Sequence, residues 1–455
     1  MTDFSGLAIA GRIATSSDPD WDQARAAWNL TADQRPDAVV FAEDAADVRA
    51  TVAFAAANSL RIAAQGTGHG AAALGPLEET ILVKTERMRG IEIDPAAQTA
   101  RVEAGVLSVE LAEAAQSRGL SSLPGSSPDV GLVGFTLGGG LSWFGRRYGF
   151  ACNRLRAVEL VTAAGEPLTV SRENDEDLFW ALRGGGGNYA VITALHLDLV
   201  PHPDAYAGAL LFPAEVGADA VRLYRDWAAT AGEDVTSVVR FLRPPDLPDV
   251  PEPLRGTPLL TIDGACIGDK EKGEAAFAPL REIGNPIMDT FDQVPAHALC
   301  RIHMDPEQPV PGLGHHRLLR ELPDEAIDAW VSLGGVDSGS PLLLTELRHV
   351  GGALGRPAED GGALSHLDAE FVLFGIGLPM TPELGKAVEG HLDRLASEME
   401  PWGAEGGYFN FAERPCDVDA ILPPEVCARL AEVKRRWDPD NRIVGNHALA
   451  LDPAA

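Results

Sequence analysis

Apolar positions in the first hundred residues form short continuous runs, typical of strands, and a segment with helical spacing between them. A short apolar run at 38–41 precedes a segment at 44–58 in which apolar residues recur near helical spacing, and a second short run follows at 61–64. Strand, helix and strand in this order predict a βαβ unit with a parallel crossover. The second strand leads directly into a glycine-rich loop at 65–70.

The same patterns predict further elements along the chain. In chain order we expect strands at 80–84, 91–93 and 99–103, a helix at 108–117, a strand at 157–162, a helix at 175–182 and a helix that follows Pro423-Pro424. Glycine is concentrated between 124 and 149 and again at 184–187. Because glycine lets the backbone come close to a ligand, these loops are candidate binding elements.

Acidic residues greatly outnumber basic ones. The chain has 67 aspartates and glutamates against 37 lysines and arginines, a formal charge of −30 at pH 7. Such a field repels nucleic acid and anionic membranes, so neither is an expected partner. A diphosphate ligand would have to be held by local backbone N–H groups rather than by overall charge.

The sequence shows no targeting or metal-binding signal. No apolar run is long enough to cross a bilayer, and residues 1–20 lack the basic and apolar regions of a secretory signal, so we expect a cytoplasmic protein. Five cysteines form no CxxC pair and are odd in number, which predicts reduced thiols rather than disulfides or structural zinc. His315, His316 and His349 lack partners at metal-ligand spacing, so no metal site is expected.

The loop Gly66-Thr67-Gly68-His69-Gly70 matches a dinucleotide-binding fingerprint only superficially. Its third glycine comes one position early, and Lys84 stands near the place of the expected acidic residue. The Walker pattern is also absent, because no GK[ST] follows. By itself the loop is as typical of a plain turn as of a cofactor site.

Four segments in the same order resemble the vanillyl-alcohol-oxidase superfamily, and specifically its berberine-bridge-enzyme-like branch of FAD-linked oxidases. They are Gly66–Gly70, the stretch from Ser127 through Gly138-Gly139-Gly140 to Gly149, the segment Asp177–Tyr189, and Tyr408-Phe409-Asn410-Phe411. The third segment, DLFWALRGGGGNY, is the most specific. The resemblance spans residues 1–200 densely and the C-terminal segment moderately.

In that family the histidine of the first loop is joined to the 8α-methyl group of FAD, and His69 holds the matching position. A neutral imidazole nitrogen can add to an electrophilic flavin, whereas a protonated one cannot. Some relatives attach the flavin a second time through a cysteine, but Ser127 holds that place. The resemblance therefore implies one covalent FAD on His69, and we expect Cys152 to be a buried small residue rather than a flavin ligand.

The resemblance also implies a set of non-covalent FAD contacts. Residues 124–140 are expected to offer N–H groups to the diphosphate, the region of Val191 to border the adenine, and Asn410 to touch the cofactor region. The alternative for each glycine is ordinary turn or helix packing. The expected cofactor-binding residues are Gln65, Gly66, Thr67, Gly68, His69, Gly70, Pro124, Gly125, Gly131, Gly134, Gly138, Gly139, Gly140, Val191 and Asn410.

Two residues are candidates for the proton acceptor that flavin-dependent oxidation of an alcohol or phenol requires. Strand alternation in 408–411 would place Tyr408 and Asn410 on one face, and in relatives the matching tyrosine lies beside the flavin, often as catalytic base. Glu346 is the second candidate, on a predicted strand where it shares a face with Arg348. Each has a structural alternative: a packed tyrosine with a satisfied hydroxyl, or a carboxylate paired with arginine.

The resemblance implies an α+β fold: an FAD-binding domain at 1–200, a substrate domain inserted at 201–404, and a C-terminal segment at 405–455 that returns to the FAD domain. A run of prolines independently marks a boundary near Pro201. The implied function is oxidation of a small organic substrate (an alcohol, a carbohydrate or a natural-product intermediate) by FAD, with dioxygen as acceptor. A dehydrogenase with another acceptor and a flavin-binding protein without turnover are the alternatives.

Overall fold

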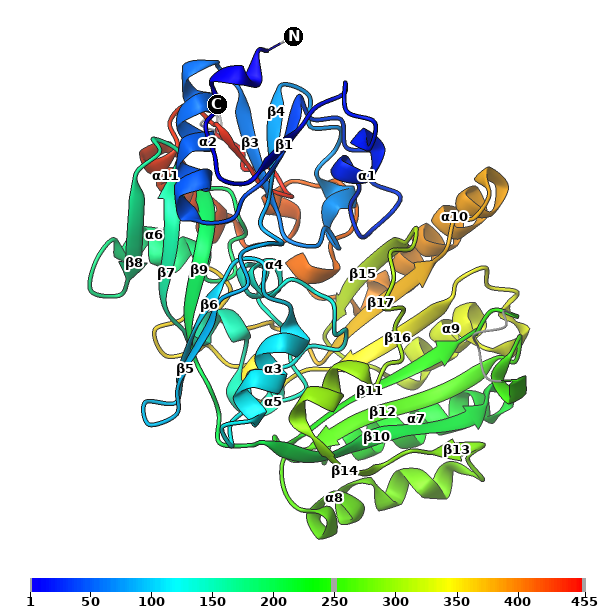
Figure 1. Ribbon diagram of the computed structural model, residues 1–455. Coiled ribbons are helices and arrows are strands. Elements are labelled where there is room, and N and C mark those ends of the chain that lie inside the picture. Colours follow the sequence, from blue (N-terminus) through cyan, green and yellow to red (C-terminus); the bar gives the residue numbers. More distant parts are fainter. Residues whose placement is uncertain (1, 247–251, 452–455) are drawn as a thin grey trace.

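The computed structural model describes residues 2–246 and 252–451. Figure 1 shows two bodies, an upper one that contains the first and last helices and a lower one built on a large sheet. Within the described part of the chain, two five-stranded sheets belong to the upper body and an eight-stranded sheet to the lower one. The chain thus builds one body, crosses to the second, and returns.

The first sheet brings distant parts of the chain together. In order across the sheet, its strands are β1 (Arg12–Ala14), β2 (Ala38–Phe41), β4 (Thr80–Lys84), β3 (Arg61–Gln65) and β18 (Ile443–Val444). All run parallel except β1, which pairs antiparallel with β2. β2 and β3 both pair with β4, so the predicted strand–helix–strand unit has a third strand between its two strands.

The helix α2 (Ala45–Ala57) connects β2 to β3, which confirms the prediction of a helix at 44–58. Asp44 begins the helix by accepting hydrogen bonds from the backbone N–H groups of Ala46 and Asp47. These are among the N–H groups that the first helical turn leaves without partners.

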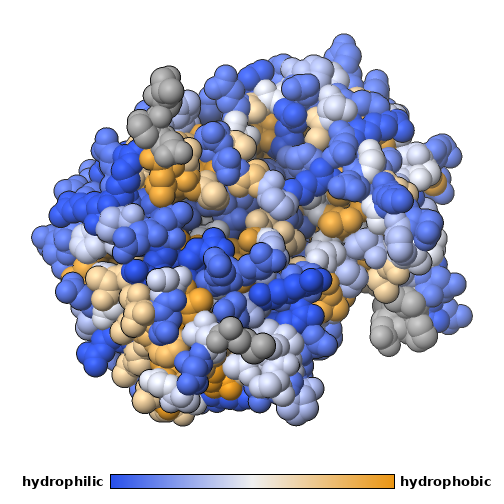
Figure 2. Space-filling view, turned by 90° about the horizontal axis from the view of Figure 1, so that it is seen from above, coloured by the Kyte–Doolittle hydropathy of each residue, from blue (hydrophilic) through white to orange (hydrophobic). Residues whose placement is uncertain are grey.

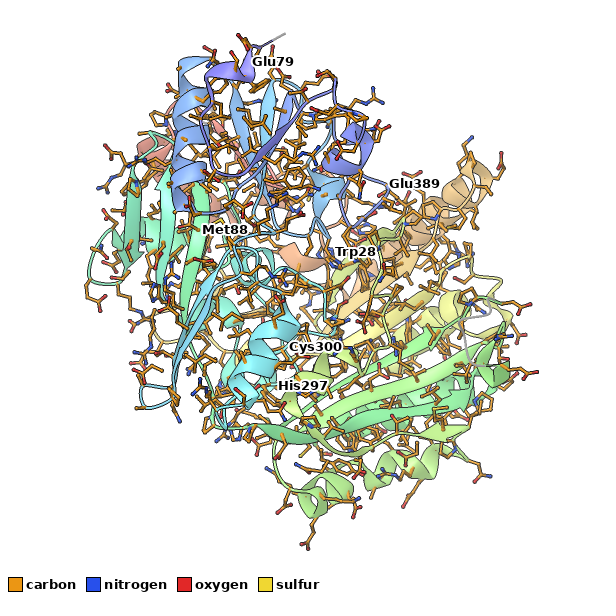
Figure 3. All side chains as sticks on the ribbon, in the orientation of Figure 1. Trp28, Glu79, Met88, His297, Cys300 and Glu389 are labelled. Atoms are coloured by element: carbon orange, nitrogen blue, oxygen red, sulfur yellow. The ribbon has the colours of Figure 1, made fainter. Side chains whose placement is uncertain are left out.

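The second sheet is antiparallel and carries the longest glycine-rich loops. Its strands are β5 (Ile91–Asp94), β6 (Thr99–Glu103), β9 (Ala190–Asp198), β7 (Leu155–Thr162) and β8 (Pro167–Ser171), in that spatial order. The helices α3 (Ser108–Gln116), α4 (Leu132–Leu137) and α6 (Glu176–Leu182) pack against this sheet, while the short helix α5 (Gly145–Tyr148) packs against β11 (Val235–Leu242) of the third sheet. Figure 3 shows His297 and Cys300 of the lower body lying next to α3, where His297 contacts the side chain of Gln116. The two bodies are therefore packed together here.

The third sheet is antiparallel and forms the lower body. Its spatial order is β13 (Met288–Asp289), β10 (Asp204–Pro213), β12 (Leu259–Cys266), β11 (Val235–Leu242), β16 (Leu344–His349), β17 (Phe371–Gly377) and β15 (Leu313–Leu319), while β14 (Asp292–Pro295) also pairs with β10. Its helices are α7 (Gly217–Ala228), α8 (Lys270–Phe277), α9 (Asp324–Gly334) and α10 (Pro382–Glu398). α7, α9 and α10 share one hydrophobic core with the sheet.

The opposite face of the third sheet carries charged residues toward the upper body. Leu347 on β16 belongs to the core beneath the helices, so its neighbours Glu346 and Arg348 point to the other face. Val238 on that face packs in one cluster with Phe144 of the upper body. Strand alternation thus places a glutamate and an arginine at the junction of the two bodies.

The C-terminal helix α11 (Pro424–Trp437) is anchored in the upper body by one buried lysine. The Nζ atom of Lys434 donates hydrogen bonds to the backbone oxygens of Asn188 and Ile443 and to Asp438, at 2.6, 2.7 and 2.6 Å. Burial lowers the pKa of Lys434, and the neighbouring Asp438 opposes that shift. The contacts join the helix, β18 and the glycine loop at 184–188.

One sequence prediction about the backbone is wrong. Residues 408–411 do not form a strand, because Phe409–Phe411 is a 3-10 helix in which the N–H of Phe411 donates to the carbonyl of Tyr408 at 3.0 Å. The N–H of Tyr408 donates to Nε2 of His316 at 2.8 Å instead of to a neighbouring strand. Tyr408 and Asn410 nevertheless meet, because the tight turn folds one onto the other.

The molecular surface in Figure 2 is mostly hydrophilic, with apolar side chains in small separate areas. Among residues 2–246 and 252–451, no helix has both the length and the apolar character needed to span a bilayer.

Candidate active site

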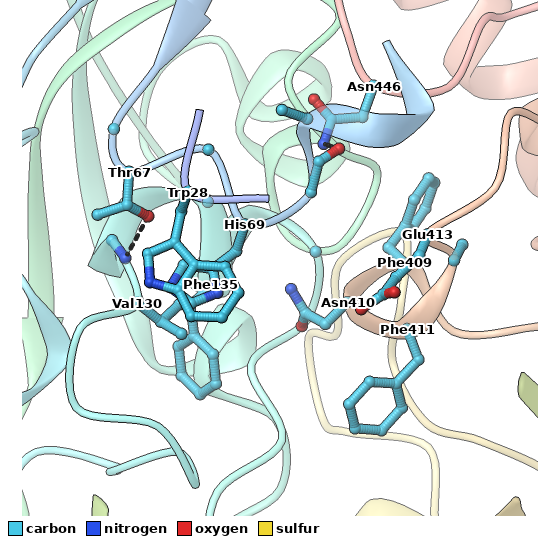
Figure 4. Close-up of a pocket in the computed structure, with 18 of the residues that line it drawn as sticks. Trp28, Thr67, His69, Val130, Phe135, Phe409, Asn410, Phe411, Glu413 and Asn446 are labelled. Atoms are coloured by element: carbon cyan, nitrogen blue, oxygen red, sulfur yellow. Dashed lines mark hydrogen bonds between the residues drawn. The ribbon is translucent and has the colours of Figure 1, made fainter. Parts of the chain in front are cut away.

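A cavity of about 390 Å³ lies between the glycine loops of the upper body and the charged face of the third sheet. This volume is within the range of about 300–1,000 Å³ typical of ligand sites. Figure 4 shows two opposite walls, with Trp28 and His69 on one and Asn410, Phe411 and Glu413 on the other. The fold therefore brings segments from both ends of the chain to one space.

All six predicted residues of the loop 65–70 line this cavity. Gly68 has a φ of +89°, and a Cβ atom there would lie 2.8 Å from Cβ of Ala27, so the position requires glycine. Oγ1 of Thr67 accepts a hydrogen bond from the N–H of Gly131 at 3.3 Å, the dashed line in Figure 4. That bond ties the first glycine loop to the second.

The remaining predicted cofactor residues fall into two groups. Gly125, Gly131, Gly134, Gly138 and Asn410 line the cavity. Within the described part of the chain, the lining does not include Pro124, Gly139, Gly140 and Val191. We therefore do not propose these four as cofactor contacts.

For two of the four residues outside the lining, the structure shows a packing role instead. A Cβ atom on Gly139, whose φ is +119°, would lie 2.8 Å from the ring of Tyr408, so this glycine is needed for packing. Val191 on β9 packs in the core beneath the first sheet, whereas its neighbours Ala190 and Ile192 line the cavity. Strand alternation turns Val191 away from the ligand space.

The C-terminal residues from the end of β18 onward form a part of the site that sequence reasoning missed. Val444, Gly445, Asn446 and His447 line the cavity because β18 lies beside β3, whose end leads into the glycine loop. Nδ2 of Asn446 donates to the carbonyl of Gly70 at 3.0 Å. The only sequence signal for this contact was the expected return of the C-terminal segment.

His69 is held between two side chains that sequence reasoning did not single out. Its ring stacks on Trp28 with centroids 3.9 Å apart and planes 19° apart. Its buried Nε2 atom lies 3.3 Å from Oδ1 of Asp129. The indole N–H of Trp28 also donates to Oδ2 of Asp129, which closes a three-residue cluster.

Two residues decide whether the flavin could be attached a second time through a cysteine: Ser127, which holds the position of that cysteine in some relatives, and Cys152. Ser127 lines the cavity and its hydroxyl donates to Oδ1 of Asp129 at 3.2 Å. Cys152 is fully buried in the hydrophobic core, outside the lining, and burial raises the pKa of its thiol to about 12. A buried thiol with such a pKa is an inert packing residue.

Tyr408 lines the cavity, and its hydroxyl is engaged in two hydrogen bonds. The hydroxyl donates to Oδ1 of Asn410 at 2.6 Å and accepts from the N–H of Leu141 at 2.7 Å. Burial raises the pKa of Tyr408 well above its ordinary value, because a phenolate there would lose its hydration. The geometry is that of a structural bridge between the tight turn and the glycine loop.

Glu346 lines the same cavity and is 1% exposed. Its Oε1 accepts a hydrogen bond from Nε of Arg348 at 2.5 Å, and its Oε2 lies 3.9 Å from Nδ1 of His303. Among the described lining residues, Arg348 is the only lysine or arginine. Because this cation is engaged by Glu346, a diphosphate in the cavity would depend on backbone N–H groups.

Behind Glu346 lies a buried polar cluster in the third sheet. Oδ2 of Asp263 lies 3.0 Å from Nε of Arg240 and 3.3 Å from Nδ1 of His303. Burial raises the pKa of Asp263 to about 7 and lowers that of His303 well below its ordinary value. The cluster beside Glu346 therefore carries fewer full charges than its residue types suggest.

Two further carboxyl groups line the cavity, and the sequence offered no signal for either. Burial raises the pKa of Asp305 to about 6 and that of Glu413 to about 7. Oε2 of Glu413 is buried and makes no hydrogen bond within the described residues. An unpaired buried oxygen that faces a cavity is a candidate ligand contact.

Comparison with known proteins agrees with this geometry. Residues 36–171 match a family model described as an FAD binding domain. The chain is 27% identical over 464 residues to (R)-6-hydroxynicotine oxidase of Paenarthrobacter nicotinovorans, with 98% of each chain covered. BBE-like 1 of Physcomitrella patens superposes with a TM-score of 0.85 at 18% identity, with 98% of each chain covered. Berberine bridge enzyme of Eschscholzia californica superposes with a TM-score of 0.82 at 21% identity, covering 98% of this chain and 97% of that one.

These findings define the class of protein as an FAD-dependent oxidoreductase with a two-domain α+β fold. The chain is similar over almost its whole length to an FAD-linked oxidase, and its fold is that of berberine bridge enzyme and a BBE-like neighbour. The cavity residues fit FAD in their chemistry, because glycine loops offer close backbone approach and Oε1 of Gln65 is a buried polar atom with no hydrogen-bond partner among the described residues.

Proposed function

We propose that the protein holds one FAD along this cavity, covalently through His69, and oxidises a small organic substrate next to Glu346. The observation that carries the proposal is one cavity with His69 and the glycine loop on one wall and Glu346 and Asn410 on the other. Bound FAD supplies the hydride acceptor. The chain's own residues bind the cofactor, orient the substrate and receive the proton.

We propose Glu346, rather than Tyr408, as the group that receives the substrate proton. Glu346 carries a carboxylate that faces the cavity, and the cation of Arg348 fixes its orientation. The hydroxyl of Tyr408 already donates one hydrogen bond and accepts another, and burial keeps it protonated. A proton acceptor must have a free lone pair within reach of the substrate, which favours the carboxylate.

A single attachment point is supported by the residues on the His69 wall. His69 belongs to a rigid loop that approaches the cavity directly, and Ser127 stands where a second attachment would need a cysteine. Serine is not a comparable nucleophile without an activating base.

The walls near Glu346 support a mainly apolar substrate. Asp305, Glu346 and Glu413 offer carboxyl groups to a hydroxyl or amino group, and seven aliphatic or phenylalanine side chains line the cavity with them: Val310, Leu343, Leu344, Phe374, Ile376, Leu378 and Phe411. A carbohydrate would leave many hydroxyl groups against these side chains without partners. We therefore propose an apolar alcohol, phenol or amine, and the name of a relative that oxidises 6-hydroxynicotine is in keeping with this class.

We propose dioxygen as the electron acceptor, because the relative that aligns over 98% of its length is named an oxidase. A dehydrogenase with another acceptor is the alternative. Reoxidation of the anaerobically reduced protein by air distinguishes the two. Recovery of the yellow colour as fast as turnover supports an oxidase, and slower recovery supports a dehydrogenase. We also propose a cytoplasmic location, which five free cysteines support.

Anaerobic flavin bleaching tests the proposed function. Purified protein is mixed with a panel of apolar alcohols, phenols, amines and sugars, and the flavin absorbance is followed. We expect bleaching by members of the apolar classes and none by sugars. A protein that is reduced by dithionite but by no compound in a broad panel would instead be a flavin-binding protein without turnover.

A further inference from the structure

Asp129 forms a built contact with His69 that involves three separate segments. Trp28 follows the helix α1 (Trp21–Arg25), His69 follows β3, and Asp129 precedes α4. The backbone N–H of Trp28 donates to the carbonyl of Thr67 at 3.0 Å, and Thr67 in turn accepts from Gly131. These hydrogen bonds hold the three segments together, so the side chains have little freedom to rearrange.

Both oxygens of Asp129 are used within this cluster. Oδ2 accepts from the indole of Trp28, while Oδ1 accepts from Ser127 and lies 3.3 Å from Nε2 of His69. Burial opposes ionisation of Asp129, but His69, Trp28 and Ser127 together lower its pKa below the ordinary value. The side chain beside the histidine is therefore a carboxylate at neutral pH.

We propose that Asp129 is the positioning residue for covalent attachment of the flavin at His69. This inference rests on the attachment proposed above. With its N–H at Nε2 turned toward the carboxylate, the imidazole presents the lone pair of Nδ1 for bond formation, and the stack on Trp28 fixes the plane of the ring. Attack by a neutral imidazole leaves it positively charged, and Asp129 stabilises that charge and accepts the proton from Nε2.

In this step the flavin ring is reduced by two electrons and the imidazole becomes covalently attached. A bond forms between Nδ1 and the 8α carbon, one C–H bond of the methyl group breaks, and the N–H bond at Nε2 breaks. Both hydrogens leave as protons, and the two electrons remain in the flavin ring, which is the oxidant. Dioxygen, the proposed acceptor, then reoxidises the ring. Asp129 thus acts on the imidazole and not on the substrate.

The test measures attachment rather than turnover. Protein prepared without flavin is incubated with FAD in air, and the attached fraction is followed by mass spectrometry of the peptide that contains His69. The variants are Asp129→Asn, which keeps the shape and loses the charge, Asp129→Glu, which restores it, and the control Asp219→Asn, whose side chain is 98% exposed on α7. A bound-FAD spectrum before denaturation reports non-covalent binding separately.

We expect Asp129→Asn to bind FAD but to attach it at least about 10-fold more slowly, the lower end of the loss seen when a partner that orients a metal-ligating histidine is removed. Asp129→Glu should recover part of the rate, and Asp219→Asn should match wild type. Attachment in Asp129→Asn at the wild-type rate would overturn the inference and leave the proposed function intact. Absence of attached FAD in wild type would instead refute the covalent link itself.

A second variant tests the inference if Asp129→Asn no longer binds FAD. Trp28→Phe keeps an aromatic ring against His69 and removes the N–H that holds Oδ2 of Asp129. If Asp129 positions the imidazole, Trp28→Phe should slow attachment several-fold with FAD binding retained. Unchanged attachment in Trp28→Phe, together with loss of FAD binding in Asp129→Asn, would assign Asp129 to the folding of the loop and overturn the inference.

Discussion

Arg348 holds the carboxylate of Glu346 from two residues further along the same strand, with Nε 2.5 Å from Oε1. Residues two apart on a strand share a face, so this pair is a direct consequence of strand geometry. The bond leaves Oε2 as the less engaged oxygen, 3.9 Å from Nδ1 of His303. A carboxylate fixed by one oxygen and available at the other is suited to accept a proton from a bound substrate.

Replacing Glu346 with Gln should slow flavin reduction by substrate. The amide keeps the size of the side chain but cannot accept the substrate proton, and loss of such a group typically costs about 10²- to 10⁴-fold in rate. Stopped-flow absorbance under anaerobic conditions measures the rate, and Glu398→Gln on exposed α10 is the matched control. A rate within about threefold of wild type, far inside that span, would rule out Glu346 as the proton acceptor.

Replacing Tyr408 with Phe should affect stability more than catalysis. The variant leaves the partly buried N–H of Leu141 without its acceptor, and an unsatisfied donor costs up to about 1–3 kcal/mol when it is fully buried. Flavin attachment should persist, and flavin reduction should stay within a few-fold of wild type. Thermal unfolding and stopped-flow reduction are compared on the same preparation. A loss of about 10²-fold or more in reduction with unchanged stability would instead restore Tyr408 as the catalytic group.

Replacing His69 with Ala should abolish acid-stable flavin but not flavin binding. The other contacts of the glycine loops remain, because Thr67 and Asn446 bond through groups that the variant retains. Wild-type protein should stay yellow after acid precipitation and carry the mass of FAD on the peptide that contains His69. The variant should give a colourless pellet and a yellow supernatant. Acid-stable colour in the variant would place the attachment elsewhere.

Replacing Glu413 with Gln should change how stability depends on pH. Burial raises the pKa of Glu413 from an ordinary 4.5 to about 7, so the folded protein keeps a proton that the unfolded chain releases. This carboxyl group therefore contributes stability below pH 4.5 that is lost as the pH rises toward about 7. The melting temperature of Glu413→Gln relative to wild type should rise between pH 5 and pH 8.

Asp263 and Asp305 have pKa values raised in the same direction, but they are present in both proteins and cancel in that comparison. If the difference in melting temperature between Glu413→Gln and wild type is the same at pH 5 and pH 8, the pKa of Glu413 is not raised in the folded protein. Asp393→Asn, which removes a half-exposed carboxylate on α10, is the control and should show little change.

Local pattern was enough to predict most backbone elements of the upper body. The strands at 80–84 and 99–103 have the predicted bounds, and α2 lies within the helix predicted at 44–58. Strand alternation, helical period and side-chain capping are interactions between near neighbours, so they are visible in a short window of sequence. The loop at 65–70 was predictable for the same reason, because its glycines follow a strand directly.

The sequence indicated the part of the site that lies in motifs and missed the rest. His69, Asn410 and Glu346 stand in segments with a recognisable pattern, and all three line one cavity. Trp28 and Glu413 line it as well, but neither stands in a pattern that marks a ligand contact. Their role follows only from the packing of the two bodies, which no window of sequence contains.

The sequence indicated the fold class and the FAD cofactor through four local motifs that resemble those of a known family, and the same resemblance singled out His69 as the proposed attachment point. Tertiary structure decided the shape of the turn at 408–411, where the alternating residues suggested a strand. His316 and Leu141, which come from other segments, fix that turn. His316 accepts a hydrogen bond from the N–H of Tyr408, and the N–H of Leu141 donates one to the hydroxyl of Tyr408. A buried polar group adopts the conformation that satisfies its hydrogen bonds, and here the partners are distant in sequence.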